Sequence, residues 1–153
     1  MRIQIKTLDQ LQKMRKAGLV VADALRQMKE AAKPGVTTLE LDAIAVDVLK
    51  SHNAQPSFLN YHGYPNVICA SVNHEIVHGI PTERPLQDGD ILSVDFGAIV
   101  DGWHGDSAWS IGIGKVAPED QLLMDICDES MWRGFAADRK STRLNSSHVK
   151  RSR

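Results

Sequence analysis

The sequence predicts an α+β fold, in which helices pack on one face of an antiparallel sheet. Apolar residues recur at helical spacing over residues 8–32 and again over residues 38–51. Short runs typical of β-strands follow, and they end in a hairpin pattern over residues 91–114. A last helical pattern begins at Pro118. The order helix, helix, strands, helix is that of an α+β domain.

Both N-terminal helices are expected to begin with a capping box. Thr7 stands three residues before Gln10, and Thr37 three residues before Glu40, so each hydroxyl and each longer side chain can cap the other's backbone N–H. The first helix should end before the Lys33-Pro34-Gly35 segment, where proline and glycine break it. Its apolar face is expected to comprise Leu8, Leu11, Met14, Val21, Leu25 and Met28.

The third helix should carry Pro118 in its first turn, where the missing N–H costs nothing. Short strands are expected around residues 57–59, 67–71 and 76–77. The apolar side of the third helix would comprise Leu122, Leu123, Ile126 and Met131, with Cys127 as a small core residue.

The hairpin pattern carries one aspartate on each strand. Asp101-Gly102 favours a tight turn with positive φ at both central positions. A turn centred there places Gly97 opposite Asp106, and Asp95 then shares a face with Asp106 because side chains repeat with period two. Two carboxylates this close repel each other, and one or two divalent metal ions would compensate. The alternative is a solvated strand end and a turn cap.

Composition bounds the broad class of the protein. The chain has 153 residues, of which 42% are hydrophobic and 24% charged, as in soluble globular domains. The sequence has no apolar run of the ~18 residues that a membrane span needs, and its N-terminus lacks the apolar core of a signal peptide. We therefore expect a cytoplasmic protein without a membrane partner, in which Cys69 and Cys127 form no disulfide.

The end of the chain differs from the rest. Residues 138–153 hold six of the 18 Lys and Arg residues but one of the 19 acidic residues, and they show no apolar periodicity. The segment DRKSTRLNSSH resembles the translation of a sequencing adapter, which we favour over a nucleic-acid-binding arm. The expected division is a folded part over residues 1–137 and a non-native or disordered basic tail over residues 138–153.

Two motifs together resemble a known family. The sequence YHGYPNVICASVNHEIVHGIP at residues 61–81, with VDFG and DGWHGDSA in the hairpin, resembles bacterial type I methionine aminopeptidases. The resemblance extends from about Ile5 to about Ala137. It implies the N-terminal half of a pita-bread fold and a metal-dependent methionyl aminopeptidase, which removes the N-terminal methionine of nascent proteins by hydrolysing their first peptide bond.

The resemblance also implies roles for three residues. Asp95 would bind one of two divalent metal ions and Asp106 would bridge both, with Co, Mn, Fe(II) or Mg as candidate ions. His78, in the HGIP motif, would contact the substrate beside the scissile amide and help to stabilise the tetrahedral intermediate. The alternative for His78 is a structural histidine before a turn.

Further residues match the wall of the family's methionine pocket, which should be apolar and suited to an unbranched thioether. Ordinary core packing is the alternative for the two tyrosines. His104 lies two residues before Asp106 and could either hydrogen-bond a carboxylate or lie on the surface. The pocket residues are Tyr61, His62, Tyr64, Cys69 and Phe58, the last standing where some relatives carry cysteine.

The remaining metal ligands of the family, one histidine and two glutamates, have no counterpart here, so the 153-residue chain alone is expected to be inactive and prone to aggregate. Two other functions stay open: a non-catalytic pita-bread module that binds protein or the ribosome, and a peptidase acting on Xaa-Pro bonds. The full-length enzyme is expected to be a monomer that acts on nascent chains, with the ribosome as a candidate partner, and to bind no specific nucleic acid.

Overall fold

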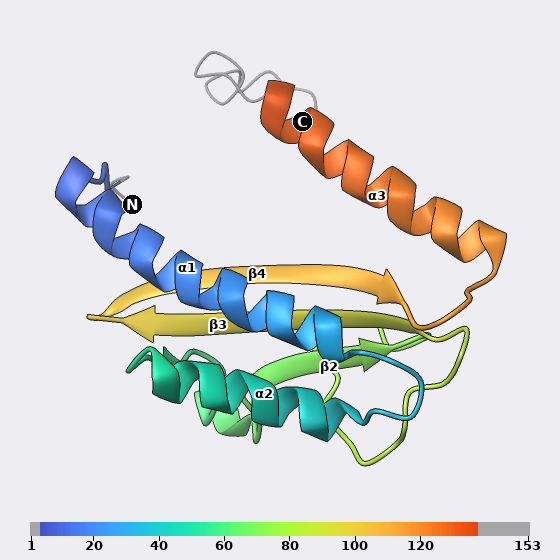
Figure 1. The fold of residues 1–153 in the computed structure, drawn as a ribbon. Coiled ribbons are helices and arrows are strands. Elements are labelled where there is room, and N and C mark those ends of the chain that lie inside the picture. The colour runs from blue at the N-terminus through green and yellow to red at the C-terminus, as the bar shows by residue number, and fades with distance from the viewer. Residues whose placement is uncertain (1–3, 138–153) are drawn as a thin grey trace, which may run out of the picture. The chain divides into compact units, whose positions relative to one another are not determined.

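The computed structural model describes residues 4–137. They fall into two compact units, one ending at Ala117 and one beginning at Pro118, and each is described by itself. The second unit contributes one described helix, α3 (Pro118–Ala137). The first contains α1 (Leu8–Ala31), α2 (Thr38–Ser51), β1 (Gln55–Pro56), a 3₁₀ turn (Tyr61–Gly63), β2 (Ile68–Val72), β3 (Ile91–Val100) and β4 (Trp103–Gly112) (Figure 1).

Both predicted capping boxes are present. Thr7 Oγ1 accepts a hydrogen bond from the Gln10 N–H, and Gln10 Oε1 accepts one from the Thr7 N–H. Thr37 and Glu40 repeat this exchange at the start of α2. These contacts satisfy backbone donors that a helix start leaves free, which explains why both helices begin where the sequence predicted.

The hairpin has the predicted register. Gly97 pairs with Asp106, and Asp95 pairs with Ala108, across antiparallel strands of ten residues each. The turn residues Asp101 and Gly102 have φ values of 50° and 79°, as a primed two-residue turn requires. The shared face of the two aspartates, deduced from the turn, is therefore confirmed.

β3 is the central strand of a four-stranded antiparallel sheet. It pairs with β4 along its whole length on one side and with β1 and β2 on the other. Helices α1 and α2 cover the same face of this sheet (Figure 1). The predicted arrangement of helices on one face is thus confirmed for the two helices of this unit.

The hydrophobic core lies between these helices and the sheet. Alternate residues of β3 point into it, and Phe96 is its largest fully buried side chain. Burying a side chain of this kind contributes roughly 1.5–3 kcal/mol. α1 approaches β4 so closely that a Cβ on Gly105 would lie 2.6 Å from the carbonyl carbon of Ala17. The other core residues include Val21, Ala24, Met28, Leu41, Val48, Ile68, Ala70, Leu92, Val94 and Ala98.

Three sequence-based predictions about this unit were wrong. Leu8 and Leu11 are exposed rather than buried, because the helix face that contacts the sheet begins at Ala17. Residues 57–59 form no strand, since pairing with β3 ends at Pro56 and the chain then turns. Residues 76–77 form no strand either and lie in an exposed loop.

α3 begins at the predicted proline, and Glu119 and Asp120 occupy its first turn, where negative charge is favoured. None of its residues is buried, so the predicted core position of Cys127 is wrong: the thiol is exposed. A single helix has no second surface against which to bury side chains. The predicted tail over residues 138–153 lies outside the described residues. Within residues 4–137, the helices are too short or too polar to span a membrane.

Candidate functional site

The face of the hairpin opposite α1 and α2 carries the two aspartates. Asp95 is half-buried and Asp106 exposed. Burial raises the pKa of the Asp95 carboxyl above its ordinary value, and the charge of Asp106 and a hydrogen bond with it raise that pKa further. The His78 charge and the Phe96 N–H act in the opposite direction. The two carboxyl groups therefore interact directly, and His78 lies near enough to affect Asp95.

This arrangement favours a cation between the strands. Adjacent carboxylate oxygens are the hard ligands that divalent ions prefer, and a cation offsets the repulsion that raises the Asp95 pKa. Among the described residues, no group of three or more His, Cys, Asp or Glu side chains could together hold a metal ion. Asp95 and Asp106 thus fit a divalent metal as part of a coordination sphere.

His78 lies in the loop between β2 and β3. Its φ of 58° lies in the left-handed region. This backbone conformation is uncommon for residues other than glycine, although histidine adopts it more often than most. The side chain is exposed. Backbone strain of this kind often accompanies functional positions, and here the residue lies near enough for its charge to act on the Asp95 carboxyl.

Cys69 and Tyr64 adjoin the carboxylates. Cys69 pairs directly with Asp95 across β2 and β3 and is buried. Burial, above all, raises the pKa of both the Cys69 thiol and the Tyr64 hydroxyl. The Tyr64 hydroxyl lies within hydrogen-bonding distance of the carbonyl oxygens of Ile68 and Gly79. Both groups therefore stay protonated near neutral pH, and they suit an apolar wall better than a nucleophile.

Phe58 lies close to the aspartate pair, whereas Tyr61 and His62 are exposed on the surface. A Cβ on Gly97 would lie 3.1 Å from Phe58 Cε1, so the Phe58 ring lies over the strand position opposite Asp106. The Tyr61 and His62 rings pack edge-to-face with centroids 4.4 Å apart, and both residues are exposed. Of the five predicted wall residues, Phe58, Tyr64 and Cys69 lie against β2 and β3.

Among the described residues, His104 forms no hydrogen bond or ion pair with a carboxylate. Its Nδ1 lies 3.1 Å from Ser57 Oγ, and Ser57 also packs against Gly97. Sequence reasoning missed Ser57, because its position was assigned to a strand that does not form. The one feature of the sequence that pointed to Ser57 is its position directly after Pro56, which ends β1.

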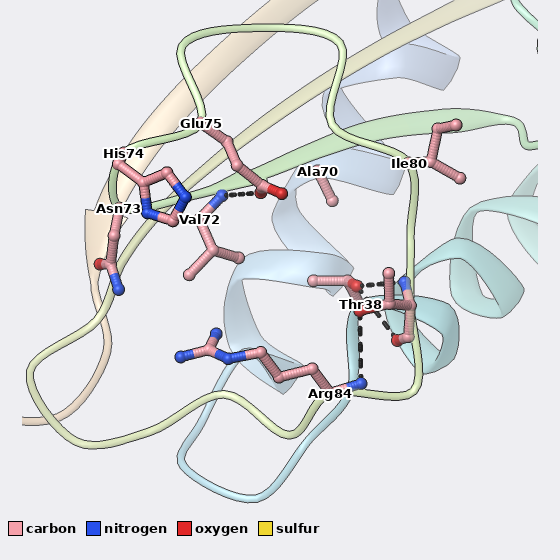
Figure 2. Close-up of a pocket in the computed structure, with 9 residues that line it drawn as sticks. Thr38, Ala70, Val72, Asn73, His74, Glu75, Ile80 and Arg84 are labelled. Atoms are coloured by element: carbon pink, nitrogen blue, oxygen red, sulfur yellow. Dashed lines mark hydrogen bonds between the residues drawn. The ribbon is translucent and has the colours of Figure 1, made fainter.

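A small cavity is lined by α2, β2 and the loop that contains His78. It has a volume of about 140 Å³ and is separate from the aspartate pair. Figure 2 shows its lining, in which Thr38 of α2 contacts the end of the loop and Glu75 contacts its beginning. The lining residues are Thr38, Ala70, Val72, Asn73, His74, Glu75, Ile80, Thr82 and Arg84.

A family model accounts for most of the chain. Residues 12–150 match the model of metallopeptidase family M24. The chain belongs to this family. Family membership agrees with the pita-bread fold that the motifs predicted, and a metallopeptidase family accounts for a carboxylate pair on the open face of the sheet.

Relatives of this M24 chain carry the name methionine aminopeptidase. The chain is 50% identical to methionine aminopeptidase 1 of Mycobacterium tuberculosis over 129 residues, and the alignment covers 84% of this chain and 48% of the relative. It is 45% identical over 145 residues to methionine aminopeptidase 1 of Bacillus subtilis, covering 94% and 58%. The crystal structure of methionine aminopeptidase from Thermotoga maritima superposes with a TM-score of 0.87 at 34% identity, covering 90% and 56%.

The M24 chain spans about half the length of the curated relatives that it matches. The names of these relatives are names of enzymes, which does not favour the non-catalytic alternative. The family name implies a bound metal. Within residues 4–137, no group of three or more potential metal ligands lies together.

Proposed function

We propose that this M24 chain carries one half of the active site of a metal-dependent methionyl aminopeptidase. The substrate would be the N-terminal methionine of nascent proteins, removed by hydrolysis of the first peptide bond. The observation that carries the proposal is the interaction of Asp95 with Asp106 on one hairpin face, with His78 near enough for its charge to act on Asp95. The names of the relatives supply the substrate class.

Asp95 and Asp106 would supply carboxylate ligands to two divalent metal ions. When bound, such ions supply an activated water and a polarised carbonyl. The oxygen ligands are compatible with Co, Mn, Fe(II) or Mg. The contribution of the chain is to fix two carboxylates at a constant separation on paired strands.

His78 would hydrogen-bond the substrate beside the scissile amide and stabilise the oxygen that develops negative charge. Because residue 78 is exposed on a loop beside the aspartates, its ring can approach a substrate from the solvent side. Phe58, Tyr64 and Cys69 would form the nearer wall of the methionine pocket, and Tyr61 and His62 its rim.

The wider setting of the proposal follows from this chemistry. We place the enzyme in the cytoplasm, where nascent chains are made, with the ribosome as a neighbour. We take residues 1–137 as the N-terminal half of the catalytic domain and the full-length enzyme as a monomer. Because no group of three or more potential metal ligands lies together in the described residues, the 153-residue chain alone should not hydrolyse peptides.

Metal binding tests the proposal directly. Mn²⁺ binding to the 153-residue chain can be followed by electron paramagnetic resonance at fixed pH and ionic strength. Asp95→Asn and Asp106→Asn should each weaken binding at least tenfold, since each removes one of two charged ligands. Asp101→Asn is the matched control, because it removes the same charge from the turn of the same hairpin.

Two outcomes would contradict the proposal: equal Mn²⁺ binding in all four proteins, or an equal loss in Asp101→Asn. Peptide hydrolysis gives a separate check. The chain alone should release no methionine from a Met-Ala-Ser peptide, and release that a chelator inhibits would show that two described ligands suffice.

A further inference from the structure

Gly79, the residue after His78, is held to strand β2 through both of its backbone polar groups. Its carbonyl accepts hydrogen bonds from the Ala70 N–H at 2.9 Å and from the Tyr64 hydroxyl at 2.8 Å. Its N–H donates to Ser71 Oγ at 3.1 Å. The peptide unit between residues 78 and 79 is thus tied to β2 by a side-chain hydroxyl.

Steric contact reinforces these hydrogen bonds. A Cβ at residue 79 would lie 2.4 Å from the Ala70 carbonyl oxygen and 2.9 Å from Ser71 Cα. Both atoms belong to the main chain of β2 and cannot move aside without disturbing the sheet. Residue 79 is therefore a glycine because the loop presses directly on β2 beside His78.

Two further contacts hold the loop on either side of His78 (Figure 2). Before His78, Glu75 Oε2 accepts a hydrogen bond from the Val72 N–H at 2.7 Å. After His78, Thr38 Oγ1 accepts a hydrogen bond from the Thr82 N–H at 2.8 Å and donates one to the Thr82 carbonyl at 3.2 Å. The contacts at Gly79 are the ones adjacent to His78 and oppose the release of its left-handed conformation.

We propose that Ser71 is a positioning residue for His78. Its hydroxyl oxygen accepts a hydrogen bond from the Gly79 N–H and so sets the orientation of the peptide group between His78 and Gly79. Ser71 is buried on β2 and pairs with Ser93 of β3, so the sheet fixes the position of its side chain. The importance of the Ser71 contact for catalysis rests on the proposed function of His78. The positioning of the loop by Ser71 does not depend on that function.

The test compares Ser71→Ala with Ser93→Ala. Ser93 is the direct cross-strand partner of Ser71 and also loses a hydroxyl contact, to Ser110 Oγ, but it makes none with the loop residue Gly79. Hydrogen exchange measured by mass spectrometry at low micromolar concentration reports two quantities. One is the protection of the Gly79 amide, and the other is the exchange rate of the His78 ring C2–H.

In Ser71→Ala, protection of the Gly79 amide should fall roughly threefold to tenfold, the factor that corresponds to one ordinary hydrogen bond. The His78 ring rate should change, and Ser93→Ala should change neither quantity. A merely structural role for Ser71 would lower protection across β2 and β3 in both variants. Equal Gly79 protection and an equal His78 rate in the two variants would overturn the proposal.

Two further measurements keep the test decisive. If Ser71→Ala does not fold, the wild-type chain still decides, since a Gly79 amide that exchanges as fast as the Val77 amide contradicts the contact. Ser71→Thr retains the acceptor and should restore protection. These readouts need neither metal nor hydrolysis, so a failure of Mn²⁺ binding would refute the proposed function and leave the positioning proposal standing.

Discussion

Gly97 pairs with Asp106 across the β3–β4 hairpin, and this one pair places Asp95 and Asp106 on the same face. Their relation is local in the sequence, because a two-residue turn connects the strands. The carboxylate pair therefore depends on few distant contacts, whereas the position of His78 depends on several.

The first prediction concerns the coupling of the two carboxyl groups. Asp106→Asn should lower the pKa of the Asp95 carboxyl, since it removes a negative charge that disfavours ionisation of Asp95. Side-chain carbon NMR across a pH titration, with a chelator present, measures this. Asp101→Asn should leave the Asp95 pKa unchanged, and an equal effect of both variants would show that only net charge matters.

A second prediction concerns acid stability. Hydrogen bonds from His52 and Arg26 lower the pKa of Asp23 from 3.8 to about 2. A lowered folded-state pKa stabilises the protein above the unfolded pKa, and this stabilisation is lost as pH falls from about 3.8 to about 2. Asp23→Asn should therefore cost about 1 kcal/mol at pH 6, after allowance for solvent screening.

Urea unfolding at pH 6 and pH 3 measures this difference, which should shrink at the lower pH. Asp47→Asn is the control, because Asp47 pairs with Lys50 on an exposed surface and should have almost no effect at either pH. A cost for Asp23→Asn that does not change with pH would contradict the predicted linkage.

A third prediction concerns the crossing of α1 and β4. Gly105→Ala would place a Cβ 2.6 Å from main-chain atoms of Ala17 and Gly18, so we expect a loss of about 1–3 kcal/mol. Gly18→Ala is the converse change, since nothing lies within 4 Å of its Cβ position. It should stabilise the helix by about 0.5–1 kcal/mol. Thermal unfolding distinguishes them, and two changes of the same sign would refute the close crossing.

A fourth prediction concerns self-association of the chain. Ile76 and Val77 in the His78 loop are 88% and 67% exposed, and such apolar surface favours association. Ile76→Glu should reduce the associated fraction in sedimentation velocity experiments. Ile5→Glu changes a similarly exposed isoleucine outside the loop and should reduce it less. Equal effects would show that the loop has no special part in association.

Sequence reasoning succeeded where structure is local. The capping boxes at Thr7 and Thr37 and the turn at Asp101-Gly102 involve residues close in the chain, so residue type and spacing decide them. It failed where burial depends on distant elements. Leu8 has the right spacing for a core residue, but the buried part of α1 begins only at Ala17.

The same distinction applies to the candidate site. The shared face of Asp95 and Asp106 follows from period-two alternation, and their proposed roles follow from motifs. The contact of Ser71 with Gly79 could not be predicted, because it depends on how a nonrepetitive loop returns to β2. The pairing of His104 with Ser57 was missed for the same reason.

The two-residue turn at Asp101-Gly102 has a last consequence, for motion. Strands joined this tightly move as one rigid body, so thermal movement of the helices should scarcely alter the separation of the two aspartates. The His78 loop runs from β2 to β3, and Gly79 ties it to β2, which itself pairs with β3. Adjustment of the site to ligands of different size should therefore arise from rotation of the exposed His78 side chain rather than from a change in the acidic pair.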